Sequence, residues 1–316
     1  MPPQHKRKPK SPKAPTPPPP QEPAASRPAR REREPARRPW LGPLALAGGL
    51  LLALAMLAGG VLLGRQLGPW RAASLPPTPS GPKRAAIVDQ TALSHPNPEL
   101  TRALVADLTA AGFTVDTYTG QEVTIALYRS LASKGYRVIV FRTHSTNDIL
   151  DVKLSGQPVY LFTSELYEKY RYVPEQMTAQ LGMAKVAYEE DAPPYFAIGP
   201  EFVKRSMAGQ FDRTLLIIGG YKSLDTLTLA QAFIAKGVAA VVGWNEWVDL
   251  SHNDQAMQKL VHALTAENLP LGQAVQETLA QVGPDPIYQS VLVYFPDYQQ
   301  DYRVGAAGSG LLAIRR

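Results

Sequence analysis

The sequence predicts an α/β domain built on a mainly parallel sheet with helices on both faces, preceded by one transmembrane helix. From residue 86 onward, short apolar runs alternate with segments of helical spacing, and several of these segments end at glycine. Upstream, residues 41–63 form a run of 23 positions without a charge. A chain of 316 residues is long enough for both parts and for a sizeable core.

Each predicted strand is a short apolar run, and each predicted helix repeats apolar residues every three or four positions. Leu100, Leu104 and Leu108 have the helical spacing, and Gly112 closes that helix. The strands are expected at 85–89, 113–118, 137–141, 158–162, 214–218 and 239–243. The helices are expected at 98–111, 124–133, 226–236, 255–264 and 271–282.

An insertion is predicted between two of the strands, over residues 164–213. Tyrosines and prolines gather in it, which indicates little regular structure. Its expected place is over an edge of the sheet.

The amino-terminal segment, residues 1–39, has the composition of a disordered tail. It holds 13 prolines, 11 lysines and arginines and 3 glutamates, with almost no large apolar side chain. Pro17–Pro20 is either a ligand for an SH3-like groove or part of a solvated spacer. The positive net charge of the chain comes from the residues before 86, because residues 86–316 have a net charge of −6. Nucleic acid is therefore not an expected partner of the domain.

Residues 40–64 are predicted to be a single membrane span. As a helix, 41–63 would extend about 34 Å, enough for a hydrocarbon core of about 30 Å. The preceding charged segment is too long for a signal peptide, so the span is expected to stay as an anchor. The basic tail places the amino terminus in the cytoplasm and the domain outside the cell membrane.

The span and the linker carry two smaller signals. Ala45, Gly49 and Ala53 are four residues apart, a spacing that lets two helices dimerise closely and that also arises by chance in such segments. Residues 65–85 are rich in proline, which predicts an extended linker before the domain at 86–316. The chain has no cysteine, so disulfides and thiol chemistry are excluded.

Polar residues follow three of the predicted strands, at 142–145, 219–223 and 244–247. The carboxyl ends of parallel strands share one edge of a sheet, where ligands bind, so these residues are expected to lie together. His144 is the candidate general base of this edge. The alternative is a histidine that only caps its strand through a backbone hydrogen bond.

The order of these segments resembles the caspase-like fold of clan CD cysteine peptidases, which includes caspases, clostripain-type enzymes and the CHAT domain. The matching stretches are 138–145, 215–222, 229–244, 254–256 and 273–277, which together span most of residues 86–285. The resemblance implies a three-layer caspase-like sandwich with a His–Cys dyad. It places the dyad histidine at His144 and the nucleophile at Gly220, or within one residue of it.

The missing thiol is where the chain departs from that family. Gly220 leaves the nucleophile position vacant, and no cysteine exists elsewhere. Ser223, Tyr221 and Ser145 are nearby hydroxyls, and a Ser–His hydrolase would need one of these serines within about 3 Å of the imidazole. The two glycines at 219 and 220 also suit a tight turn or a backbone amide site.

Trp244 and Asn245 at a strand end, with Asp254 in a matched stretch, are the candidates for contacting a peptide. Trp244 also suits the rim of a core. The histidines lack metal-binding spacing and no phosphate-loop motif occurs, so no metal or cofactor is expected.

Three functions remain open from the sequence. The first is a membrane-anchored pseudopeptidase that binds or scaffolds a peptide or protein partner. The second is an active serine-type hydrolase that uses His144 with Ser223 or Ser145. The third is a purely structural surface domain without a peptide groove.

Overall fold

The computed structural model describes residues 83–147, 149, 156–187, 189 and 191–304. The predicted tail at 1–39 and span at 40–64 lie outside this range, as does the linker at 65–85 except for its last three residues. No helix within the described ranges is both long and apolar enough to cross a membrane. Strand β1 begins at Arg84, one residue before its expected start and two residues before the expected start of the domain at 86.

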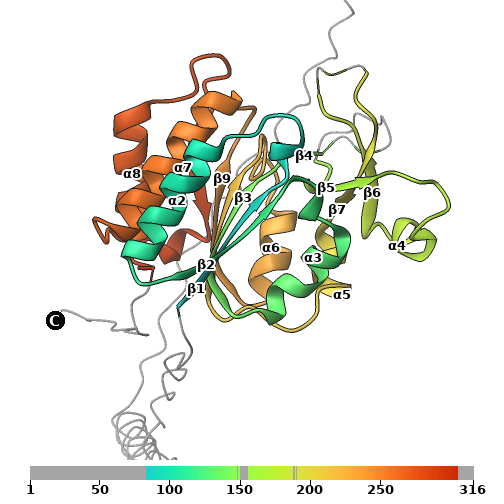
Figure 1. Cartoon of the computed structure of the whole chain (residues 1–316), viewed down its shortest axis with the longest axis horizontal. Helices are drawn as coiled ribbons and strands as arrows, with labels where there is room; N and C mark the ends of the chain where they lie inside the picture. Colours follow the sequence, from blue (N-terminus) through green and yellow to red (C-terminus); the bar gives the residue numbers. More distant parts are fainter. Residues whose placement is uncertain (1–82, 148, 150–155, 188, 190, 305–316) are drawn as a thin grey trace, which may run out of the picture. The chain divides into compact units, whose positions relative to one another are not determined.

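A central sheet of six strands runs through the described domain (Figure 1). Its order is β10-β9-β8-β3-β1-β2, and all neighbours are parallel except the antiparallel pair β9 and β10. The strands are β1 (Arg84–Asp89), β2 (Thr114–Thr119), β3 (Tyr136–Arg142), β8 (Thr214–Gly219), β9 (Val238–Trp244) and β10 (Leu292–Phe295). The mixed α/β class with a mainly parallel sheet is therefore confirmed.

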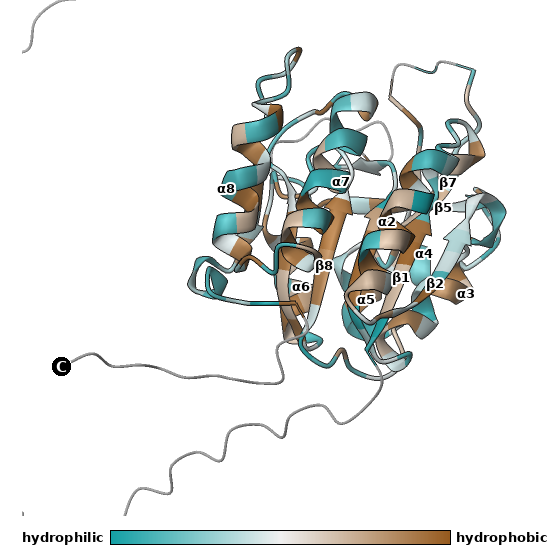
Figure 2. Ribbon diagram, turned by 60° about the vertical axis from the view of Figure 1, so that its left-hand side comes forward, coloured by the Kyte–Doolittle hydropathy of each residue, from teal (hydrophilic) through white to brown (hydrophobic). Residues whose placement is uncertain are grey.

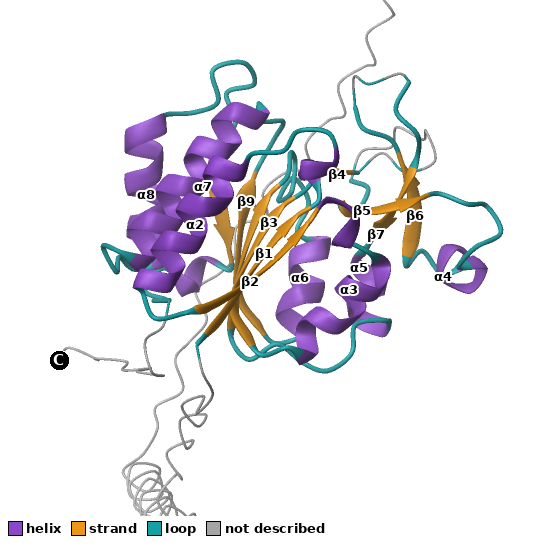
Figure 3. Cartoon of the chain, viewed as in Figure 1, coloured by secondary structure: helices purple, strands orange, loops and turns teal. Residues whose placement is uncertain are grey.

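Helices cover both faces of this sheet, so the domain has three layers (Figure 3). Alternate residues of the strands point to opposite faces, which gives two separate apolar cores. One core packs against α2 (Pro98–Ala110), α7 (Leu250–Thr265) and α8 (Leu271–Val282). The other packs against α3 (Ile125–Ser130), α5 (Pro200–Arg205) and α6 (Thr228–Ala235). The brown interior strand of Figure 2 shows how continuously apolar a doubly covered strand is.

A second, antiparallel sheet corrects the expectation for residues 164–213. Its order is β4-β5-β7-β6, and it lies beside α3 and α5 in Figure 1. The strands are β4 (Ser145–Thr146), β5 (Tyr160–Leu166), β6 (Leu181–Ala184) and β7 (Tyr195–Ile198), with α4 (Val173–Met177) between β5 and β6. The strand expected at 158–162 belongs to this sheet and not to the central one. The tyrosines that suggested irregular structure pack instead, since the rings of Tyr167 and Tyr172 both lie against Phe196.

Two further differences concern the carboxyl-terminal third. Helix α7 begins at Leu250, five residues before its expected start, because the Asp249 side chain accepts hydrogen bonds from the amides of Ser251 and His252 and caps the helix. Strand β10 was not predicted. It joins the sheet at its edge through an antiparallel ladder with β9.

Candidate functional site

The three polar strand ends predicted from the sequence meet at one edge of the central sheet. Arg142 is the register partner of Gly219, and Ile218 is the partner of Gly243, so β3, β8 and β9 end at the same level. The chain leaves β1 toward β2 on one side and returns to β3 on the other, which makes the gap between β1 and β3 the topological switch point. Ligands of open α/β sheets bind beyond such a point.

A buried ion cluster fills the switch point. Arg142 donates from Nε and a terminal nitrogen to the two carboxylate oxygens of Asp254, at 2.7 and 2.8 Å, and from its other nitrogen to Asp89 at 3.0 Å. Arg142 and Asp89 are almost completely buried. Burial raises the pKa of Asp89 despite the opposing charge of Arg142.

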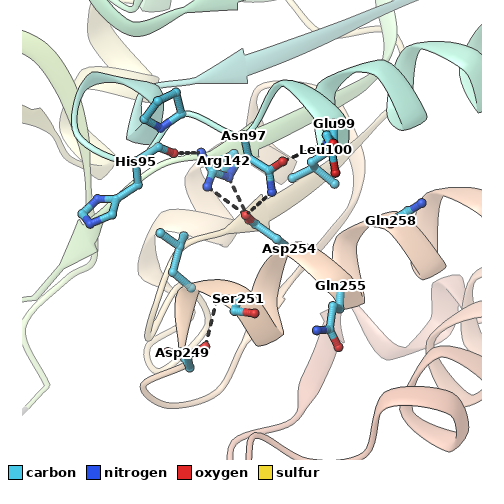
Figure 4. A pocket seen from close by; sticks show the side chains of 12 residues that line it. His95, Asn97, Glu99, Leu100, Arg142, Asp249, Ser251, Asp254, Gln255 and Gln258 are labelled. Carbon is cyan, nitrogen blue, oxygen red and sulfur yellow. Dashed lines mark hydrogen bonds and ion pairs between the residues drawn. The ribbon is translucent and has the colours of Figure 1, made fainter.

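Asp254 is therefore the ion-pair partner of Arg142, and it also lines the pocket described next, so its expected contact with a peptide stays a prediction. Its second carboxylate oxygen also accepts a hydrogen bond from the Asn97 side chain at 2.9 Å. Asn97 in turn caps α2 by accepting from the amide of Leu100 (Figure 4). The cluster thus fastens the starts of α2 and α7 to the ends of β1 and β3.

An open pocket of about 770 Å³ lies above this cluster, between the first turns of α2 and α7 (Figure 4). The charged side chains that line the pocket are mainly acidic. Arg142 also lines it, but its guanidinium is already paired with Asp89 and Asp254. The lining carboxylates are Glu99, Asp249 and Asp254, with the polar side chains of His95, Asn97, Ser251, Gln255 and Gln258 beside them. Such a lining suits a cationic group.

His144 lies two residues after the end of β3, as the sequence predicted for this edge. Its backbone amide donates to the Gln90 side chain at 3.1 Å, and its ring lies edge-on to Phe162 with centroids 5.7 Å apart. Its Nε2 atom is buried and finds no hydrogen-bond partner among the described residues. Burial, the neighbouring His95 and the charge of Arg142 lower the pKa of His144 to about 4.

The low pKa of His144 predicts a pH dependence of stability. Between pH 6.5 and about pH 4 the unfolded chain binds a proton at this imidazole that the folded domain does not. The free energy of unfolding should therefore fall as the pH falls through this window, by about 3 kcal/mol from this group. The difference in stability between the protein and a His144→Phe variant, followed by urea unfolding, measures this part alone. An NMR titration of His144 near its ordinary pKa of 6.5 would contradict the prediction.

The glycine pair at the end of β8 is closely packed, so the predicted nucleophile position at Gly220 has no side chain and no open space for one. A Cβ atom on Gly220 would lie 2.5 Å from the Ser145 hydroxyl oxygen and 2.8 Å from the Thr143 carbonyl oxygen. At Gly219 it would collide with the sulfur of Met257. The neighbouring chain segments already fill the space that a side chain would need.

Both candidate serines are engaged in backbone contacts. The Ser145 hydroxyl donates to the Tyr221 carbonyl oxygen, which fastens the end of β3 to the loop after β8. Ser223 is fully buried, donates to the Ile218 carbonyl oxygen at 3.1 Å and accepts from the amide of Trp244 at 2.9 Å. This geometry fits a structural serine at both positions and does not present a nucleophile to solvent.

Trp244 is a core residue, with none of its surface exposed, and this corrects its expected contact with a peptide. Its indole nitrogen donates to the Asn253 side chain at 2.9 Å. Asn245 is exposed, and its side-chain oxygen accepts from the amide of Val291, which ties the end of β9 to the segment before β10.

A row of aromatic rings crosses the same edge of the sheet. The ring of His144 lies 5.9 Å from that of Tyr221, Tyr221 stacks on Trp247 at 4.5 Å, and Trp247 lies 6.4 Å from Tyr288. We call these four residues the ring row. Tyr288 and the neighbouring Ile287 are exposed, and Tyr221 and Trp247 are partly exposed. Tyr221 and residues 244–247 were expected at this edge, but Tyr288 was not, because nothing in the local sequence ties residue 288 to the strand ends.

No group of three or more His, Cys, Asp or Glu residues in the described part of the chain is placed to hold a metal ion. No family model matches the chain, and no curated protein matches it. Among solved structures, it is similar to the Arg-specific cysteine proteinase gingipain R, with a TM-score of 0.40 and 8% identity. The similarity covers 63% of this chain and 42% of that one, so the chain spans about two fifths of the proteinase's length. At this level it assigns neither an activity nor a residue role.

Proposed function

We propose that the domain binds a peptide or protein segment at the carboxyl edge of its central sheet without cleaving it. The observation that carries this proposal is the packing of Gly220, whose missing side chain is replaced in space by Ser145. A pseudopeptidase of this kind keeps an imidazole, a pocket and a ring row at one edge, and lacks a nucleophile aimed at them. The absence of cysteine from the whole sequence supports the same conclusion.

The chemistry of the edge favours an extended, basic segment as the ligand. Aromatic rings offer large apolar area at little cost in side-chain entropy, and the rings of Trp247 and Tyr288 are neighbours with centroids 6.4 Å apart. The pocket beside them carries three carboxylates against one paired guanidinium. A lysine or arginine side chain of the ligand fits this charge.

The anchor belongs to the same proposal. The uncharged run at 41–63 would hold the domain at the outer face of the cell membrane, and the basic tail would stay in the cytoplasm. The domain would then act as a scaffold at the membrane surface.

The test is peptide binding by the full-length protein in detergent, with fluorescent peptides that contain Arg or Lys. We expect binding with no cleavage, and Trp247→Ala should weaken it about tenfold or more, as for an aromatic hot spot. Tyr298→Ala is the matched control, because Tyr298 is an exposed ring outside the ring row. Equal loss in both variants would contradict the proposed site.

The rival hydrolase has its own signature in the same experiment. Cleavage of the peptides, with labelling of Ser145 or Ser223 by a fluorophosphonate that depends on His144, would refute the binding proposal. Neither cleavage nor binding would leave the structural domain as the remaining interpretation.

A further inference from the structure

We propose that residues 166–177, from the end of β5 through α4, contact the membrane and rest in the interface of the bilayer to which the chain is anchored. We call this segment the α4 hairpin, because the chain runs out from β5 to α4 and then returns to β6; β5 and β6 themselves lie on either side of β7 and do not pair. This inference rests on the anchor part of the proposed function and adds a second contact with the same membrane.

Apolar exposure is concentrated in the α4 hairpin. Tyr170 and Met177 are 85% and 83% exposed, and Leu166 and Val173 are also exposed. These are four of the eight large hydrophobic residues that the described domain exposes, gathered within twelve positions. Figures 1 and 3 show α4 standing away from the three-layer body, beyond the small sheet. Clustered exposure of this kind marks a contact surface.

Hydrogen bonds and ring contacts within the hairpin fix its conformation, so its apolar side chains are exposed as part of an ordered structure. The Gln176 side chain donates to the Arg171 carbonyl oxygen and accepts from the Tyr167 hydroxyl at 2.9 Å. Tyr167 and Tyr172 point inward onto Phe196. Tyr170 and Met177 are then left on the outside of an anchored hairpin.

Its charges suit a lipid headgroup region. The two carboxylates within the hairpin each lie near an arginine, Glu175 at 2.5 Å from Arg129 and Glu168 at 3.8 Å from Arg171. Arg171 also pairs at 2.7 Å with Glu165, which lies just before the hairpin. Lys169 lies over the Tyr170 ring at 5.5 Å. Tyrosine beside lysine is the usual composition of the membrane interface, where the ring stays near the acyl boundary and the ammonium reaches headgroups.

A bilayer fits this surface better than a protein partner does. A standard protein interface uses about 20–30 residues on each side, and the hairpin offers far fewer. A weak interfacial contact suffices when the chain is already anchored, because the contact becomes intramolecular with a high effective concentration. The segment between the uncharged run and the first described residue, 64–82, spans at most about 65 Å, which keeps the domain within reach of the bilayer.

The test uses the full-length chain reconstituted in liposomes of phosphatidylcholine and phosphatidylserine. Because the chain has no cysteine, a Met177→Cys variant takes a single environment-sensitive dye. We expect lipids that carry a doxyl quencher in the upper acyl chain to lower its emission at least twofold. Tyr298→Cys, at a 76% exposed position outside the hairpin, is the control and should be unaffected.

The outcomes separate the two proposals. If the chain floats with the liposomes and the dye at 177 is not quenched, or is quenched no more than the dye at 298, the hairpin contact is wrong and the anchor stands. If the chain does not float, the anchor fails and the inference falls with it. A change of emission at 177 that requires an added protein, and not lipid, also overturns the inference. Adding Tyr170→Ser to the Met177→Cys variant should leave the fold intact and reduce the quenching of the dye at 177.

Discussion

Replacing Arg142 by methionine should destabilise the domain by about 3–5 kcal/mol. The change leaves Asp89 and Asp254 close together without the guanidinium that now bonds to both. Asp89 is almost fully buried, and an uncompensated buried charge is among the most costly defects in a protein interior. The loss is measured by urea unfolding of the variant and the original protein at pH 7.

The control and the pH dependence make this prediction specific. Arg102→Met removes an exposed arginine whose nearest carboxylate is 3.9 Å away, and should change stability by less than about 0.5 kcal/mol. Loss of Arg142 raises the pKa of Asp89 further, because the charge and the hydrogen bond of Arg142 no longer oppose the effect of burial. A raised folded-state pKa favours the folded state at low pH, so the deficit of Arg142→Met should shrink as the pH falls from 7 toward 4. A deficit that is equal at both pH values would contradict the ion cluster.

Gly220→Cys should destabilise the domain by about 2 kcal/mol or more and should not create a peptidase. The new Cβ would press on the Ser145 hydroxyl and on the Thr143 carbonyl, and overpacking against backbone is poorly relieved. The thiol would also enter a packed gap and not a substrate cleft. Thermal unfolding and cleavage of Arg- and Lys-containing peptides measure the two effects.

Three further variants serve as controls for Gly220→Cys. Gly220→Ala should cost a similar amount, since the Cβ atom causes the collision. Combining Gly220→Cys with Ser145→Gly should restore part of the stability and no more, because the Thr143 carbonyl remains 2.8 Å away. Ser94→Cys places a thiol at an exposed position and should be neutral. A fully stable Gly220→Cys protein that cleaves these peptides, with the cleavage abolished by iodoacetamide, would contradict the proposal of a binding domain.

The central sheet was predictable because its strands are buried on both faces. Continuous apolar runs such as Val138–Phe141 are typical of strands in a parallel sheet that is covered on both faces. The small sheet was not predictable in the same way. Strands β6 and β7 have four residues each, too few for a periodic signal, and their stability comes from pairing with each other and with β5.

The candidate site was predictable only in its location. The rule for parallel strand ends brought His144, the glycine pair and Asn245 to one edge. Individual roles depended on contacts between residues far apart in the chain. Asp254 lies 112 positions from Arg142, and the polar first turn of α7 is buried because it serves this ion pair and Trp244. The local sequence contains no information about such a distant pair. A buried polar residue such as Asp254 therefore cannot be told from a surface residue by its sequence neighbours.

The position of β1 in the sheet has a mechanical consequence. The chain enters the domain through β1, which pairs along its whole length with β2 on one side and β3 on the other. A pull on the preceding residues would load both ladders along the strand axis, so that many hydrogen bonds must break together and not one after another. A force applied to the chain just before β1 is therefore opposed by both ladders at once.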